Sequence, residues 1–202
     1  MSEITAAQVK ALRDATGAGM MDAKRALIEA DGDAARATEV LREKGLASAA
    51  KRAGRSAQQG LIESYIHFNN NVGSMIELSC ETDFVAHTDE FRRLARDLAL
   101  HVASPSAPRW LSRDDVPIAA LDAERKVYEA QMRLQEKSED KIPMIVENKL
   151  DSFLKENVLL EQPFVKDDAR TVQQLLDEVA AKVGEKVAVR RFVRYKLGEM
   201  EA

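Results

Sequence analysis

The sequence contains a single cysteine, Cys80, among 202 residues. One thiol cannot form an internal disulfide, which suits a reducing cytosol. No apolar run approaches the length that spans a membrane, and the opening Met1-Ser-Glu-Ile-Thr5 is unlike a signal peptide. We therefore expect a soluble, cytoplasmic protein without a membrane partner.

A strong excess of positive charge is also lacking. Charged residues make up 32% of the chain, yet the formal net charge is only -4. Phosphate binding depends on concentrated positive charge, so a dominant nucleic-acid-binding field is not expected. Direct contact with nucleic acid is therefore not the first expectation for this chain.

Signatures of enzymes and cofactor sites are missing as well. The Gly17-Ala-Gly19 pair follows a predicted helix, whereas a dinucleotide-binding loop follows a strand. Asp83 and His87 are four residues apart, but no third ligand stands at metal-site spacing. His67 and His101 have no nucleophile or carboxylate at informative spacing, so we expect surface histidines. We predict no metal, no cofactor and no covalent chemistry.

The length allows one sizeable core and a small additional module. Residues 1–46 predict three short helices, in which Thr5 and Gln8 form a capping-box pair. Asp33 is placed to cap the third helix, which we expect to end at Gly45. Such a module has a small core, and its size suits a binding platform better than an enzyme.

Residues 47–59 are predicted to be a basic linker. The stretch from Lys44 to Arg55 contains four basic residues and no acid, and its alanines favour a helix. Two interpretations stay open at about even odds. The linker is either a plain solvated segment, or its basic face meets an acidic partner surface or RNA.

Residues 60–202 predict a mixed core that begins with a hairpin at 61–80. Ile62, Ile66 and Phe68 share one face of the first strand, and three asparagines follow as turn residues. The second strand alternates up to Cys80, which we expect to be buried as a small hydrophobic residue. A helix near 89–103 follows.

The remainder alternates between helices and a last strand. A charged helix over 121–137 carries an apolar stripe of Ala123, Val127, Ala130 and Leu134. Pro143 suits the first turn of the next helix, whose predicted buried face is Ile145, Val146, Leu150, Phe153 and Leu154. A third helix follows Thr171, and Gly184 ends it.

The final strand, 186–195, places Val187, Val189, Val193 and Tyr195 on one face, with Arg191 among them. We expect this strand to join the hairpin, because an isolated two-stranded hairpin is marginally stable. The predicted fold class is α+β, with helices packed on a small antiparallel sheet.

The stretch Cys80–Ala86 lies where the second hairpin strand ends and a helix is about to begin. Packed elements on both sides would fix the corner formed by Thr82, Asp83, Phe84 and Val85. An isolated aromatic such as Phe84 is most often a core residue. The alternative is an exposed phenyl ring, beside an acid, that enters another molecule.

Five segments of the chain resemble one protein family, in the order that the family has them. Along the chain they are Thr16-Gly-Ala-Gly-Met-Met-Asp-Ala-Lys-Arg-Ala-Leu27, Thr82-Asp-Phe-Val-Ala86, Thr88-Asp-Glu-Phe91, Leu159-Leu-Glu-Gln-Pro-Phe-Val-Lys166 and Arg190-Arg-Phe-Val-Arg-Tyr195. The chain is similar to the short form of bacterial elongation factor Ts. These proteins are guanine nucleotide exchange factors that release GDP from elongation factor Tu during translation.

The resemblance implies a fold and two groups of site residues. The N-terminal helices would form a ubiquitin-associated-like module that docks on elongation factor Tu in its GDP-bound state through Arg13, Met20, Met21 and Lys24. The corner Thr82, Asp83, Phe84 and Val85 would enter the partner's nucleotide-binding domain and dislocate its Mg²⁺. Short forms lack a second core subdomain, so a homodimer acting on two partner molecules is expected.

The sequence departs from the family pattern at a few positions. His87 stands where a basic or small polar residue is usual, and Asn148 replaces a usual glycine. Two other functions stay open: a ribosome- or RNA-associated protein that uses the basic linker, and an interaction module that binds without changing nucleotide kinetics. Adjacent Met20 and Met21 cannot both face one helix stripe, so we expect at least one of them to be exposed. An exposed, adaptable methionine suits a partner-binding surface.

Overall fold

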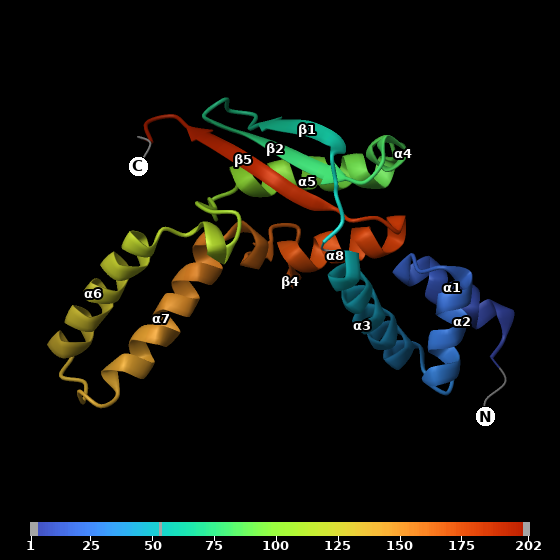
Figure 1. Cartoon of the computed structure of the whole chain (residues 1–202), viewed down its shortest axis with the longest axis horizontal. Coiled ribbons are helices and arrows are strands. Elements are labelled where there is room, and N and C mark those ends of the chain that lie inside the picture. The colour runs from blue at the N-terminus through green and yellow to red at the C-terminus, as the bar shows by residue number, and fades with distance from the viewer. Residues whose placement is uncertain (1–3, 53, 200–202) are drawn as a thin grey trace. The chain divides into compact units, whose positions relative to one another are not determined.

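A computed structural model describes residues 4–52 and 54–199 of the chain. The chain divides into two compact units, which we describe separately (Figure 1). The first consists of Met1–Ile62, Glu77–Ala95 and Gln174–Arg190, and the second of Glu63–Ile76, Arg96–Gln173 and Arg191–Ala202. The α+β class is confirmed, while the predicted domain boundaries at 46 and 59 stay predictions.

Three helices open the first unit: α1 (Ala6–Thr16), α2 (Met20–Glu29) and α3 (Ala34–Arg52). The capping box of Thr5 and Gln8 is confirmed, and the Asp33 carboxylate accepts hydrogen bonds from the first turn of α3. The helices share a small core of Val9, Leu12, Ala23, Ala26, Leu27, Ala30 and Ala37. This arrangement confirms the predicted three-helix module.

The expected end of the third helix at Gly45 is wrong. The helix continues through Gly45 to Arg52, and Gly45 does not adopt the positive φ of a helix-ending glycine. The alanine-rich stretch that follows favours continuation, because alanine has the highest helix propensity. The first part of the predicted linker is therefore helical.

Three strands, β1 (Gln59–Ile66), β2 (Val72–Cys80) and β5 (Ala188–Lys196), form one sheet in the order β1-β2-β5 (Figure 1). The predicted hairpin is confirmed, and Asn70 adopts a positive φ of 57° in its turn. Glycine is required at Gly60, because a Cβ there would lie 2.1 Å from the Leu78 carbonyl oxygen. The last strand joins the hairpin as expected.

The apolar faces of the strands are only partly buried. Ile62 and Ile66 are exposed, and Phe68 lies in the turn beyond the end of β1, so it does not share the strand face as predicted. On β5, Val189 is buried with the preceding Val187, whereas Val193 and Tyr195 are exposed. Met75 of β2 and Leu197, directly after β5, are exposed as well.

Helix α5 (Asp89–Ala103) confirms the helix expected near 89–103. Its apolar side is fully buried at Phe91, Ala95, Leu98 and Val102. In the second unit, the Ser74 hydroxyl of β2 donates a 2.6 Å hydrogen bond to the Ala99 carbonyl of α5. This bond satisfies a buried hydroxyl where the helix lies along the strand.

In the second unit, α6 (Ile118–Leu134) and α7 (Ile142–Asn157) form a helix pair. The buried face predicted for α7 is confirmed at Val146, Leu150 and Phe153. The stripe predicted for α6 is wrong, because all four of its residues are exposed. Met132 and the half-buried Tyr128 face α7 instead, because this is the side of α6 that packs on α7.

The chain then forms elements that the sequence did not predict. A two-stranded sheet pairs β3 (Pro163–Phe164) with β4 (Asp167–Thr171), and two 3₁₀ turns span Arg113–Asp115 and Leu159–Glu161. Helix α8 (Val172–Val183) starts directly after Thr171, and Gly184 ends it with a positive φ of 76°, as predicted. No helix among the described residues combines the length and apolar character needed to cross a membrane.

The prediction that His101 lies on the surface is wrong. Its ring is fully buried in the second unit, where Nε2 lies 2.9 Å from Gln162 Oε1 and Nδ1 accepts a hydrogen bond from the Val165 N–H at 3.1 Å. The Gln162 amide donates to the carbonyl oxygens of Ser106 and Glu156. The histidine is therefore a core residue, and its partners Gln162 and Val165 lie more than 60 positions away, where spacing alone did not indicate them.

Candidate functional site

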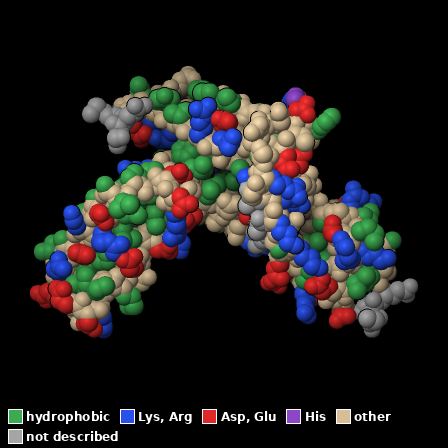
Figure 2. Space-filling model, viewed as in Figure 1, with side chains coloured by type: hydrophobic (Ala, Val, Ile, Leu, Met, Phe, Trp, Pro, Cys, Tyr) green, Lys and Arg blue, Asp and Glu red, His purple; other side chains and the backbone are tan. Residues whose placement is uncertain are grey.

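The corner after β2 is a single helical turn, α4 (Asp83–Ala86), that begins directly after Thr82. Val85 and Ala86 are buried and attach the turn to the first unit. Phe84 points the other way, with 82% of its surface exposed. In Figure 2 a hydrophobic side chain projects into solvent beside α4. The sequence left Phe84 open between core and surface, and the structure places it on the surface.

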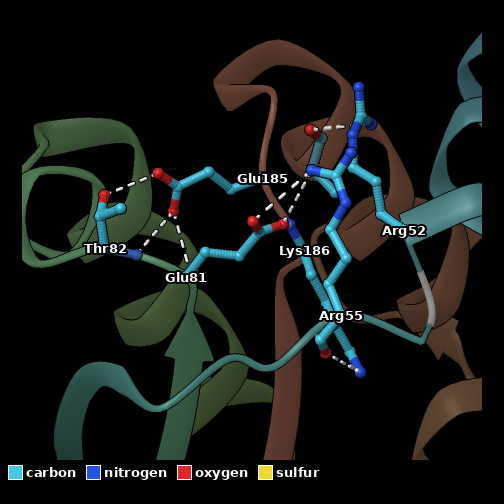
Figure 3. Close-up of polar contacts among 7 residues, drawn as sticks. Arg52, Arg55, Glu81, Thr82, Glu185 and Lys186 are labelled. Carbon is cyan, nitrogen blue, oxygen red and sulfur yellow. Dashed lines mark hydrogen bonds and ion pairs between the residues drawn. The ribbon is translucent and has the colours of Figure 1, made fainter.

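A carboxylate from the turn between α8 and β5 holds the start of this corner (Figure 3). Thr82 Oγ1 donates to Glu185 Oε1 at 2.6 Å, and the Thr82 N–H donates to Glu185 Oε2 at 3.0 Å. The Glu81 N–H donates to the same Oε2 at 3.1 Å. One side chain therefore satisfies three donors where the strand has ended.

A second carboxylate, that of Glu81, makes the reciprocal contact from the corner to the turn that carries Glu185. The Glu81 carboxylate accepts the Lys186 N–H at 2.7 Å and a longer bond, 3.3 Å, from Arg55 Nη1 (Figure 3). The Lys186 N–H bond, assisted by Arg55, lowers the pKa of the Glu81 carboxyl below its ordinary value. We call the four residues Arg55, Glu81, Glu185 and Lys186 the carboxylate clamp.

Cys80 immediately precedes Glu81 of the clamp in the sequence and is buried, as predicted. Its Sγ donates to the Thr82 carbonyl oxygen at 3.1 Å. Burial raises the pKa of the thiol to about 11, and the negative charge of Glu185 acts in the same direction. A protonated, covered thiol is unreactive, so Cys80 acts here as a packing residue.

Asp83 and His87 contact each other through the backbone of the turn. His87 Nδ1 lies 2.7 Å from the Asp83 carbonyl oxygen, which is one helical turn away. The Asp83 carboxylate is exposed beside Phe84. Within residues 4–52 and 54–199, no group of three or more histidine, cysteine, aspartate or glutamate side chains could hold a metal ion.

The four residues expected in the docking module are all exposed. Arg13 is near the end of α1, and Met20, Met21 and Lys24 lie on the first turns of α2. Met20 is 47% and Met21 64% exposed, whereas Ala23 of the same helix is fully buried. An adjacent pair of exposed methionines gives α2 an adaptable apolar surface.

Three of the four basic side chains in the stretch from Lys44 to Arg55 make contacts within the chain. Lys44 pairs with Glu29, Arg55 with Glu81, and Arg52 Nη1 donates to the Ala180 carbonyl oxygen at 3.5 Å. Charges that are paired internally contribute little to an electrostatic field. Two of the four charges, those of Lys44 and Arg55, are paired in this way, and both interpretations of the linker stay predictions.

Glu185 is the site residue that the sequence analysis missed. Its sequence neighbourhood is unremarkable, since an acid after a helix-ending glycine is typical of a solvated turn. Its partners are 103 and 104 positions away along the chain. No local sequence signal indicated this pairing; in the structure Thr82 precedes α4 but makes no side-chain capping bond to it.

Comparison with known proteins assigns the family. The family model described as Elongation factor TS matches residues 6–199. The chain is 54% identical over 196 residues to elongation factor Ts of Moorella thermoacetica, covering 97% of this chain and 96% of that protein. Elongation factor Ts of Fervidobacterium nodosum is 49% identical, covering 98% of this chain and all of that protein. The chain therefore belongs to the elongation factor Ts family, the guanine nucleotide exchange factors for elongation factor Tu in translation.

Proposed function

We propose that this protein releases GDP from elongation factor Tu by inserting the corner Thr82–Val85 near the partner's Mg²⁺ and phosphate site. The observation that carries the proposal is Phe84, a large apolar side chain left 82% exposed on a turn fixed from both sides. Exposed aromatic side chains on rigid elements are typical anchors at protein interfaces. The comparisons support the family activity, and the insertion is our inference from the exposure.

Each corner residue has a distinct role in this mechanism. Phe84 displaces partner side chains near the phosphates, while the Asp83 carboxylate presents a negative charge and a hydrogen-bond acceptor beside it. Thr82 and Val85 hold the shape of the corner. The partner's Mg²⁺ demands near-ideal octahedral geometry, so a small displacement of its surroundings weakens nucleotide binding.

Thermodynamic linkage sets a condition on this mechanism. If the protein lowers the affinity of elongation factor Tu for GDP by some factor, GDP lowers the affinity of the two proteins for each other by the same factor. The complex therefore has to form with the GDP-bound partner and become tightest after GDP leaves. This cycle needs no covalent chemistry and no cofactor of the exchange factor itself.

The N-terminal module would supply docking energy at a second place on the partner. Arg13, Met20, Met21 and Lys24 give it two cations and an exposed apolar pair. Docking by a separate module keeps the complex together while the corner acts on the nucleotide site. Truncation of residues 1–50 should therefore weaken binding, and an unchanged affinity would exclude this role.

We further propose a homodimer. Ile66, Phe68, Tyr195 and Leu197 of the second unit are all exposed apolar side chains on or next to β1 and β5. Figure 2 shows hydrophobic side chains gathered where β1 lies in Figure 1. A second copy of the chain would cover such residues, and two copies would act on two partner molecules. A monomeric mass at working concentration would count against the dimer.

The deciding experiment is release of a fluorescent GDP from purified elongation factor Tu, with this protein present in substoichiometric amount. Acceleration over many turnovers is the expected result. Binding without acceleration would leave an interaction module. Steeply salt-dependent affinity for RNA, without any effect on GDP release, would instead favour the RNA-associated alternative.

A further inference from the structure

We propose that Glu185 is a positioning residue for nucleotide exchange, whose carboxylate fixes the Thr82 peptide and thereby directs Phe84 toward the partner. The inference rests on the proposed function and adds to it a residue outside the corner. It starts from the three hydrogen bonds, of 2.6, 3.0 and 3.1 Å, that this one carboxylate accepts from Glu81 and Thr82. Glu185 is the acceptor for both donors of Thr82, the hydroxyl and the N–H.

The corner needs an external support because it is too short to hold itself. Helix α4 contains four residues, and a single helical turn is unstable without tertiary contacts. The Thr82 side chain makes no capping hydrogen bond to α4, and its hydroxyl donates to Glu185 instead. Phe84 cannot anchor the turn either, because its side chain is exposed.

Support therefore comes from the residues on both sides of Phe84. On the following side, Val85 and Ala86 are buried. On the preceding side, the Glu185 carboxylate fixes two consecutive N–H groups. Hydrogen bonds to an ionised acceptor are shorter and stronger than those between neutral groups, so this contact limits the rotation of the Thr82 backbone.

The clamp is reciprocal, which makes it more selective for one arrangement than a single contact. Glu185 accepts N–H groups from the β2–α4 corner, while Glu81 of that corner accepts the N–H of Lys186. Each carboxylate thus accepts hydrogen bonds from backbone N–H groups of the segment that carries the other carboxylate. Removal of Glu185 leaves the Glu81 and Thr82 N–H groups without this acceptor, and we expect the corner to sample other orientations.

The test compares Glu185→Ala with Glu185→Gln. The glutamine has the same shape, and its amide oxygen can still accept an N–H, but it lacks the charge. The alanine removes every contact. Glu147→Ala is the matched control, since Glu147 is an exposed carboxylate on α7 that pairs with Arg125 and belongs to neither proposed site.

Exchange and docking are measured separately for each variant. Maximal acceleration of fluorescent-GDP release, at saturating exchange factor, should fall about tenfold in Glu185→Ala and less in Glu185→Gln, because a misplaced group loses its effect steeply with displacement. Affinity for nucleotide-free elongation factor Tu should change much less. The Phe84→Ala/Glu185→Ala double variant should be no slower than Phe84→Ala alone, since the two residues act through one step.

The Cys80 thiol reports on the clamp without any partner protein. It is fully buried and donates to the Thr82 carbonyl oxygen, so alkylation requires opening of the corner. Both Glu185 variants remove a charge that raises the thiol pKa, and this contribution is common to them. We expect Cys80 to be alkylated about tenfold faster in Glu185→Ala than in Glu185→Gln. This difference measures how often the corner opens, because the effect on the thiol pKa is the same in both variants.

The outcomes separate the two proposals. A wild-type protein that fails to accelerate GDP release overturns the proposed function and the exchange role of Glu185, whatever the thiol shows. An active wild type with Glu185→Ala at full maximal rate overturns the positioning role. Equal losses of rate and affinity, or additive losses in the double variant, overturn it as well, because they indicate a general structural defect. Circular dichroism and the Glu147→Ala control identify such a defect directly.

Discussion

Replacement of Phe84 by alanine should separate exchange from both folding and docking. A phenylalanine side chain offers about 150–250 Å² of surface for burial, and 82% of Phe84 is available to a partner. Insertion would then bury roughly 120–200 Å², which at about 25 cal/mol per Å² corresponds to ~3–5 kcal/mol. If this energy is realised only while GDP leaves, its loss slows the accelerated release by about a hundredfold or more.

The same exposure predicts that the variant folds normally. Truncation of an exposed side chain changes the free energy of unfolding by about 0.5 kcal/mol or less, whereas truncation of the fully buried Phe91 would cost about 3–5 kcal/mol. The assay is stopped-flow release of fluorescent GDP at saturating exchange factor, together with the affinity for nucleotide-free elongation factor Tu. Leu134→Ala, an exposed apolar residue at the end of α6, is the control. Equal loss of release rate and affinity, or full activity of Phe84→Ala, would refute the proposed insertion of Phe84 into the partner.

Three further predictions follow from the docking module, the buried histidine and the exposed sheet residues. Met21→Glu should weaken docking about tenfold at an unchanged maximal release rate, measured by titration of the exchange rate; an unaffected midpoint would contradict the docking role. Burial lowers the pKa of His101, so the native state binds fewer protons than the unfolded chain and stability should fall as pH drops below about 6.5. The urea midpoint should show this fall in the wild type and in His67→Gln but much less in His101→Gln, and equal slopes would exclude His101 as the cause. Phe68→Ser should shift the dimer to monomer in sedimentation experiments, and no shift would exclude Phe68 from the interface.

Features that depend on neighbours within one turn were predictable from the sequence. Thr5 with Gln8 and Asp33 before α3 cap their helices because the donor and acceptor are three residues or fewer apart. The β1–β2 hairpin and α7 follow from alternation, turn residues and a proline in the first helical turn. The corner itself was predictable too, because it lies between two strongly patterned elements.

Tertiary structure decided which apolar faces are covered and which distant polar groups meet. Residue type and spacing do not state how many partners a helix has, so the regular stripe of α6 was exposed while Met132 was buried. The buried His101 finds its hydrogen-bond partners in Gln162, 61 positions away, and Val165, 64 positions away. Glu185 reaches Thr82 over 103 positions, a pairing fixed by chain topology. The sequence by itself determined where the corner lies and that it carries Phe84, while the fold determined that Phe84 is exposed and what holds it there.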